Sequence, residues 1–340
     1  MYQKTMLSPS KLKSHQLRHQ AKAFRKTKNL HALSRLLNTS TPFMHVFANN
    51  PRYQQFYVAK SNGGQRLIEN PNEPLKKLQQ RLAFFLSAIY FEKRPDCAHG
   101  FIKAAADEPK GRGIYSNALQ HANSKWVFNL DLRDFFHSIS RNRVRLFFRQ
   151  YPMRFSKNAA DCLAGICTYQ GRLPMGAPTS PVLSNLVCIG LDKKLMALAA
   201  DKKWVYTRYA DDLTFSAKKP FKKKHIQAIR NLIREAGFII NEDKVQKWKK
   251  GERPEITGLI LKNKKPDLKK DYLADLQRDI DIYFYLQSQP LKERRIFAKQ
   301  QLETYKKSII GQINFVGQVK GKKHKSYKKL AKQMGLRKAS

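Results

Sequence analysis

The sequence has few residues of the kinds that cross-link or anchor a chain. Only four of its 340 residues are cysteines, and their spacing fits neither a zinc site nor a disulfide framework. No apolar run approaches the roughly 18 residues that a membrane span needs. The first 40 residues lack the apolar core of a signal peptide, so we expect no export signal, no membrane partner and a reducing, cytoplasmic setting.

Acidic residues are also scarce. The chain has 25 Asp and Glu against 67 Lys and Arg, a formal net charge of +42, and no acidic residue precedes Glu69 or follows Glu303. Such a field repels itself and strongly attracts polyanions. The charge favours a large nucleic-acid partner, held partly by counterion release, over a merely solubilising surface.

Two of these scarce carboxylates stand together in the stretch 206–216, YTRYADDLTFS. β-Branched and aromatic residues lead into Asp211 and Asp212, and a second alternating run leads out, which predicts a strand, a tight turn and a returning strand. An Asp-Asp pair at a surface turn is common. This stretch alone slightly favours that plain interpretation.

A second strand changes the balance. Residues 126–132, WVFNLDL, alternate so that one face is apolar and Asp131 falls on the other, at the end of a core-like strand. Hard divalent cations take oxygen ligands, and two of them can activate a hydroxyl and stabilise a leaving oxygen. We therefore predict that Asp131, Asp211 and Asp212 form a carboxylate cluster that holds two Mg²⁺ ions for nucleotidyl transfer.

The tetrad Tyr209-Ala210-Asp211-Asp212, with the upstream strand carrying Asp131, resembles the catalytic core of reverse transcriptases. The resemblance implies an α+β, right-hand polymerase with fingers, a palm built on an antiparallel sheet, and a helical thumb. It also implies the backbone carbonyl of Leu132 as a metal ligand. The expected parts are a basic N-terminal segment at 1–40, fingers at 41–125, a palm at 126–260 with inserted helices at about 141–172, and a basic helical thumb and tail at 261–340.

The fingers prediction is based on two patterns. Asn62-Gly63 lies between two strand-like runs and predicts a hairpin over 57–68, and apolar residues at helical spacing predict a helix over 74–91. This order resembles the fingers of these polymerases and implies that Arg66 meets the incoming triphosphate. A plain surface arginine on an edge strand is the alternative.

Two further positions acquire roles from the resemblance. Phe136 stands five residues after Asp131, where the family places the ring that excludes a ribose 2′-OH. Core packing is the alternative for Phe136 and the expectation for Phe135. Lys244, in the segment Asn-Glu-Asp-Lys, would protonate the pyrophosphate leaving group, against the default of a solvated lysine.

The loop around Gly176 is flanked by Pro174 and Pro178, so its backbone can approach a ligand closely. It resembles the polymerase loop that holds the template base and the nucleotide. The chain departs from the family at Met175, where Gln is usual. A thioether cannot reproduce the hydrogen bonds of an amide, which puts the nucleotide contacts there in doubt.

Two other elements resemble retron reverse transcriptases in particular. Asn117 and His121, four residues apart on one face of a short expected helix, form an Asn-Ala-x-x-His motif associated there with recognition of the cognate RNA. The strand with the turn Thr257-Gly258 resembles a second element of that subgroup. For His121, a purely structural role is the alternative. A basic stretch of the thumb is expected to follow a nucleic-acid backbone with Lys320, Lys322 and Lys323.

The leading hypothesis is thus a bacterial retron reverse transcriptase. The resemblance implies that it binds a structured noncoding RNA, primes from the 2′-OH of a guanosine, consumes dNTPs and leaves a branched RNA–DNA product. It also implies an effector protein, a role in antiphage defence and a higher-order oligomer. The alternatives are another bacterial reverse transcriptase, such as a group II intron-like enzyme, or a polymerase-shaped RNA-binding scaffold.

Overall fold

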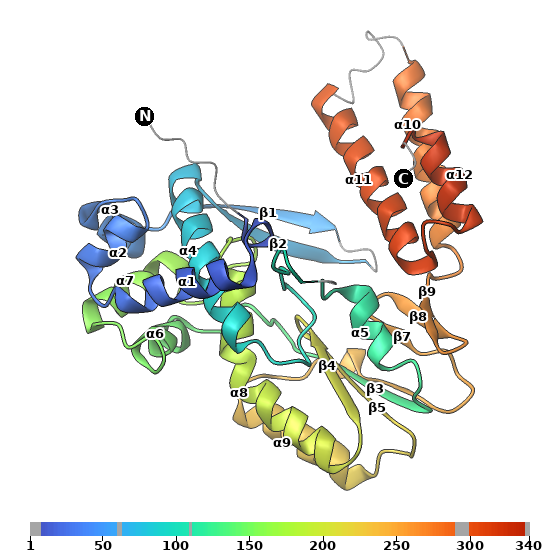
Figure 1. The fold of residues 1–340 in the computed structure, drawn as a ribbon, viewed down its shortest axis with the longest axis horizontal. Helices are drawn as coiled ribbons and strands as arrows, with labels where there is room; N and C mark the ends of the chain where they lie inside the picture. Colours follow the sequence, from blue (N-terminus) through green and yellow to red (C-terminus); the bar gives the residue numbers. More distant parts are fainter. Residues whose placement is uncertain (1–7, 60–62, 109–110, 290–298, 337–340) are drawn as a thin grey trace. The chain divides into compact units, whose positions relative to one another are not determined.

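The computed structural model describes residues 8–59, 63–108, 111–289 and 299–336 (Figure 1). They form two compact units. The first comprises residues up to 113 together with 124–250, and the second comprises 114–123 together with 251 onward. Helices and antiparallel sheets occur in both, which confirms the α+β prediction. None of the helices in the described ranges is long and apolar enough to cross a membrane.

A four-stranded antiparallel sheet, in the order β4-β5-β3-β6, organises the first unit. Strand β3 is central and is buried on both faces, so its polar residues as well as its apolar ones are covered. The register places Asp131, the last residue of β3, opposite Asp212, the first residue of β5. The strands are β3 (Trp126–Asp131), β4 (Val205–Tyr209), β5 (Asp212–Ala217) and β6 (Gln246–Trp248).

Helices cover this sheet and build the hydrophobic core. The basic N-terminal segment is part of that core, because Phe24 of α1 stacks on Phe85 of α4 with ring centroids 5.4 Å apart and meets Phe155 edge-on at 5.3 Å. The helices are α1 (Ser14–Lys26), α2 (Leu30–Leu36), α3 (Thr41–Asn49), α4 (Glu73–Lys93), α6 (Arg141–Arg149), α7 (Lys157–Cys167), α8 (Ser180–Asp201) and α9 (Lys223–Glu235), with 3-10 turns at Pro9–Lys11 and Glu242–Lys244.

The predicted hairpin is confirmed. Strands β1 (Tyr53–Ala59) and β2 (Gln65–Pro71) pair antiparallel, with Val58 opposite Arg66. Residues 60–62 of its expected turn lie outside the described residues. The helix expected at 74–91 is α4, which begins after Asn72, whose side chain accepts a hydrogen bond from the Leu75 amide.

The second unit combines a small sheet with long helices. Strands β7 (Glu255–Ile256), β8 (Leu259–Lys262) and β9 (Lys265–Asp267) form an antiparallel meander, and the short helix α5 (Ile114–Gln120) packs on β8 and β9. The helices α10 (Tyr272–Ser288), α11 (Lys299–Lys320) and α12 (Lys325–Gln333) follow, as predicted for the C-terminal part. The buried stripe of α10 consists of Leu276, Ile280 and Tyr283.

Residues 238–241, FIIN, have the apolar and β-branched composition that predicts a strand. That prediction is wrong, because only Ile240 forms an isolated bridge, to Leu132. The backbone hydrogen bonds of this segment go to the loop that follows β3: the Arg133 amide donates to the Ile239 carbonyl at 2.8 Å, and the Asn241 amide donates to the Asp131 carbonyl at 2.8 Å. Satisfying those groups leaves no regular ladder, yet it fixes the end of β3.

Candidate active site

The three predicted carboxylates lie at one end of two neighbouring strands. Asp131 ends β3, Asp212 opens β5 opposite it, and Asp211 occupies the turn between β4 and β5. Ala210 has a positive φ of 57°, which is uncommon for a residue with a Cβ. The Leu132 amide donates to the Asp211 carbonyl at 3.1 Å, so the turn is also hydrogen-bonded to the residue after β3.

The cluster is electrostatically strained. Burial, and next the negative charge of Asp131, raise the pKa of Asp211 above its usual range. Lys244 relieves part of this, because its Nζ lies 3.0 Å from Oδ2 of Asp131. Burial alone would lower the pKa of Lys244, but the hydrogen bond and charge of Asp131 outweigh it and the pKa is raised. Oδ1 of Asp131 accepts a 3.4 Å hydrogen bond from the Asn241 side chain.

The chemistry of these donors fits a hard divalent cation, because every side-chain donor is a carboxylate oxygen and the carboxylates already draw in an ammonium group. Over the described ranges, however, no group of three or more His, Cys, Asp or Glu side chains is gathered closely enough to hold a metal ion. Two bound Mg²⁺ ions therefore stay a prediction for Asp131, Asp211, Asp212 and the Leu132 carbonyl.

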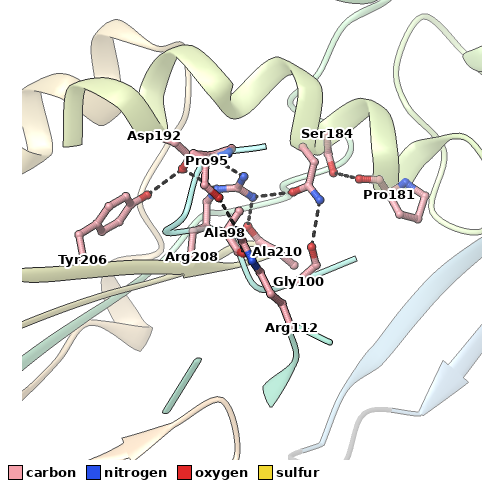
Figure 2. A network of polar contacts seen from close by, with 11 residues as sticks. Pro95, Ala98, Gly100, Arg112, Pro181, Ser184, Asp192, Tyr206, Arg208 and Ala210 are labelled. Carbon is pink, nitrogen blue, oxygen red and sulfur yellow. Dashed lines mark hydrogen bonds and ion pairs between the residues drawn. The ribbon is translucent and has the colours of Figure 1, made fainter. Parts of the chain in front are cut away.

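A buried ion pair between strand β4 and helix α8 is hydrogen-bonded to the turn that carries Asp211 (Figure 2). The Arg208 guanidinium on β4 donates to both carboxylate oxygens of Asp192 on α8, at 2.8 and 2.7 Å. Tyr206 donates to the same carboxylate at 3.0 Å. The remaining nitrogen, Nη1, donates to the Ala210 carbonyl at 3.1 Å and to the Asn185 side chain at 3.0 Å. Arg208 thus connects the turn that carries Asp211 to helix α8.

The segment 97–100 also contacts Arg208, Asn185 and the turn at Ala210. Asn185 donates from Nδ2 to the Gly100 carbonyl at 2.9 Å, and the His99 amide donates to the Arg208 carbonyl at 2.8 Å. Gly100 packs so tightly that a Cβ there would lie 2.5 Å from the Ala210 nitrogen. The segment therefore limits where Ala210 can move, and Figure 2 shows Gly100 beside Ala210 in this network.

Sequence reasoning did not find this support. Arg208 lies inside the stretch 206–216, for which the sequence predicts a role only for the two aspartates, and Asp192 lies outside every predicted motif. A signal existed, since Asn185 and Asp192 are seven residues apart and so share a face of α8 with its buried leucines. Polar residues on a buried helix face require partners.

The residues expected to contact the nucleotide lie on three separate elements of the same unit. Arg66 is exposed on β2, and its charge acts to lower the pKa of Asp211. The ring of Phe136 is half-buried and lies 5.8 Å from that of Phe101, whereas Phe135 is buried and packs on Phe238. The phenylalanine pair thus divides as predicted into a core residue and a partly exposed one, but the role of Phe136 stays a prediction.

Gly176 has a φ of 135°, and a Cβ there would lie 2.7 Å from the Glu69 carbonyl oxygen. The close approach predicted for this glycine is thus made, within this structure, by the backbone of β2. Contact with a nucleotide at Gly176 stays a prediction.

The residues expected to bind RNA lie in the second unit. Asn117 and His121 are buried, and Asn117 donates from Nδ2 to the Thr257 hydroxyl at 3.4 Å. Thr257 and Gly258 both have positive φ, at 48° and 84°, and form the turn between β7 and β8. The structure therefore brings the two retron-like elements together, because Asn117 is hydrogen-bonded to that turn and His121 is buried one helical turn further along the same segment. Their contact with RNA stays a prediction.

The three predicted lysines divide into two kinds. Lys320, at the end of α11, is mostly buried and its Nζ lies 2.6 Å from Asp267. Lys322 and Lys323 follow it and are exposed. The latter two are therefore available to a phosphate backbone, whereas Lys320 has an acidic partner within its own unit.

Residues 58–261 match the family described as reverse transcriptase (RNA-dependent DNA polymerase). Among curated proteins, the chain is 28% identical over 309 residues to "Retron Ec86 reverse transcriptase" of Escherichia coli, covering 86% of this chain and 90% of that protein. It is 32% identical over 265 residues to "Retron Mx162 reverse transcriptase" of Myxococcus xanthus, covering 68% of this chain but 52% of that protein.

The coverage of the two relatives differs. The chain spans about half the length of the Myxococcus relative, although nearly all of the Escherichia relative. All three aspartates and the hairpin residue Arg66 lie inside the matched region, and the α+β architecture fits a right-hand polymerase. The match covers more than half of the chain, so the chain belongs to the reverse transcriptase (RNA-dependent DNA polymerase) family, with bacterial retron reverse transcriptases as its relatives.

Proposed function

We propose that this chain is an RNA-directed DNA polymerase of a retron, in which Asp131, Asp211 and Asp212 are the catalytic carboxylates. The observation that carries the proposal is the register of the central sheet, which sets Asp131 directly opposite Asp212 with Asp211 at the adjoining turn. Three carboxylates at one edge, inside the matched region, suit nucleotidyl transfer better than a purely structural role.

Each nearby residue has a proposed task. The three aspartates and the Leu132 carbonyl would hold divalent cations, which when bound supply the positive charge that the reacting phosphate needs. Lys244, which is paired with Asp131 in this structure, would give a proton to the departing pyrophosphate. Arg66 would pair with the triphosphate of the incoming dNTP, and the ring of Phe136 would exclude a ribose 2′-OH.

The proposed template is a structured noncoding RNA. The net charge of +42 supports a polyanionic partner, since lysines and arginines release counterions when they neutralise phosphates. By analogy with the retron relatives, synthesis begins at the 2′-OH of a guanosine and gives branched, RNA-linked single-stranded DNA. We include in the proposal a role in antiphage defence with an effector protein, and assembly into a higher-order oligomer.

The test is to purify the protein together with its native locus and to run the bound nucleic acid on a denaturing gel, with and without RNase, DNase and debranching enzyme. A discrete DNA whose mobility changes after RNase or debranching supports the retron proposal. An unbranched DNA product would favour another bacterial reverse transcriptase. RNA alone from a complete locus would contradict polymerisation and favour an RNA-binding scaffold.

A further inference from the structure

Glu69 is a buried carboxylate outside the catalytic cluster. Its side chain, near the end of β2, has no exposed surface. It accepts hydrogen bonds from Arg172 Nη1 at both oxygens, at 3.1 and 2.9 Å, and Nε2 of His137 lies 3.1 Å away. Gln55 on the paired strand donates at 3.4 Å. A charge in such a place requires a dense set of partners, and Glu69 has them.

Glu69 also holds both backbone groups of Met175. The Met175 amide donates to Oε2 of Glu69 at 3.2 Å, and the Glu69 amide donates to the Met175 carbonyl at 2.7 Å. The thioether of Met175 offers no hydrogen-bond donor of its own. The loop is thus fixed at this residue through its backbone.

Three elements meet at this one carboxylate. Glu69 lies three residues after Arg66 on β2, His137 directly follows Phe136, and Met175 directly precedes Gly176. Ile68 and the Glu69 carbonyl also pack against Gly176 so closely that a Cβ would lie 3.1 and 2.7 Å from them. Each element therefore carries one of the proposed nucleotide contacts.

The carboxylate is held in its charged form. Burial would raise the pKa of Glu69, but the hydrogen bonds and charge of Arg172 outweigh burial, and the pKa is lowered. The amide of Met175 and the ring of His137 act in the same direction. A neutral amide in place of Glu69 could accept fewer of these bonds and would weaken all of them.

We propose that Glu69 is the positioning residue of the nucleotide pocket: it sets the distances between Arg66, Phe136 and Gly176 and thereby the affinity for the incoming dNTP. The proposal is built on the polymerase function proposed above. Glu69 itself faces Arg172, His137 and Met175, so it acts through them and not on the substrate.

The test compares wild type with Glu69→Gln in two assays. The first measures kcat and KM for a single dNTP on an RNA template. The second measures the dissociation constant of the dNTP in a complex whose primer lacks a 3′-OH, which needs no catalysis. We expect Glu69→Gln to weaken dNTP binding and raise KM about tenfold or more, since charge-assisted hydrogen bonds are lost, with kcat and primer–template affinity nearly unchanged.

Two further variants make the result decisive. Glu73→Gln removes a carboxylate from the exposed first turn of α4 and should leave dNTP binding unchanged. If Glu69→Gln does not fold, Arg172→Gln weakens the same network from its partly exposed side and should raise KM in the same way. Unchanged dNTP binding in a folded variant, or equal losses in KM, kcat and template affinity, would overturn the proposal. Wild type that binds dNTP but never incorporates it would instead contradict the polymerase function.

Discussion

The guanidinium of Arg208 and the carboxylate of Asp192 form a two-bond ion pair in which neither side chain has any exposed surface. The pair joins strand β4 to helix α8. Because Arg208 also donates to the Ala210 carbonyl, the residue before Asp211 is connected to the core. Desolvating two charges is costly, and in this chain the pair also fixes the turn that carries Asp211.

Asp192→Asn should destabilise the protein by about 3 kcal/mol or more, because Arg208 would remain buried without its counter-charge. Denaturant unfolding measures the difference. Asp201→Asn at the end of the same helix removes an exposed partner of Lys202 and should change the free energy of unfolding by less than about 1 kcal/mol. Equally small changes in the free energy of unfolding for both variants would contradict the stabilising role of the buried pair.

Gly100→Ala should impair polymerisation more than its single methyl group suggests. The new Cβ would lie 2.5 Å from the Ala210 nitrogen, so the turn that carries Asp211 must move. The matched control is Gly190→Ala, at a solvent-exposed position in the middle of α8, where a Cβ would meet no atom within 4 Å. There alanine should stabilise the helix by about 1 kcal/mol and leave the rate unchanged. Primer extension with both variants tests this, and normal extension by Gly100→Ala would contradict it.

Phe136→Val should relax the choice between dNTPs and rNTPs. If the ring of Phe136 blocks a 2′-OH, removing it relieves a clash of about 1–3 kcal/mol and raises relative rNTP incorporation about tenfold or more. The control is Phe135→Leu, in which a buried neighbour is changed and selectivity should stay the same although stability falls. Single-nucleotide incorporation with both substrate types gives the ratio, and an unchanged ratio for Phe136→Val assigns that ring to packing.

His99 gives a prediction on pH. Burial, with the positive charge of Arg112 adding to it, lowers the pKa of His99 from 6.5 to about 4. The unfolded chain therefore binds a proton that the folded chain does not, and stability is lost as pH falls from about 6.5 to about 4. Compared with His99→Gln, wild type should lose up to about 3 kcal/mol more over this range. Parallel pH curves in urea unfolding would contradict the assigned burial effect.

The sequence was sufficient where structure depends on neighbours along the chain. The hairpin around Arg66, helix α4 and the strands on either side of Asp211-Asp212 follow from alternation, helical spacing and turn residues, and all are present. Local periodicity determines these features, so a single amino-acid sequence is enough to predict them.

The sequence was insufficient where partners are far apart along the chain. Arg208 and Asp192 are 16 residues apart on a strand and a helix, and Glu69 reaches Arg172 across 103 residues. No periodicity links such pairs. The segment 238–241 shows the reverse case, since its strand-like residues bond to the loop after β3 instead of forming a ladder. Tertiary hydrogen bonding decided the outcome there, not propensity.

The most direct test of the central claim is single-nucleotide incorporation on an RNA template by wild type, Asp211→Asn and Asp243→Asn, with RNA binding measured in parallel. Asp243 is an exposed carboxylate close to Lys244 in sequence and serves as the matched control. We predict that Asp211→Asn lowers the rate about 10³-fold or more, that Asp243→Asn does not, and that all three bind RNA alike. Incorporation by Asp211→Asn at the wild-type rate would contradict the assignment of the catalytic carboxylates.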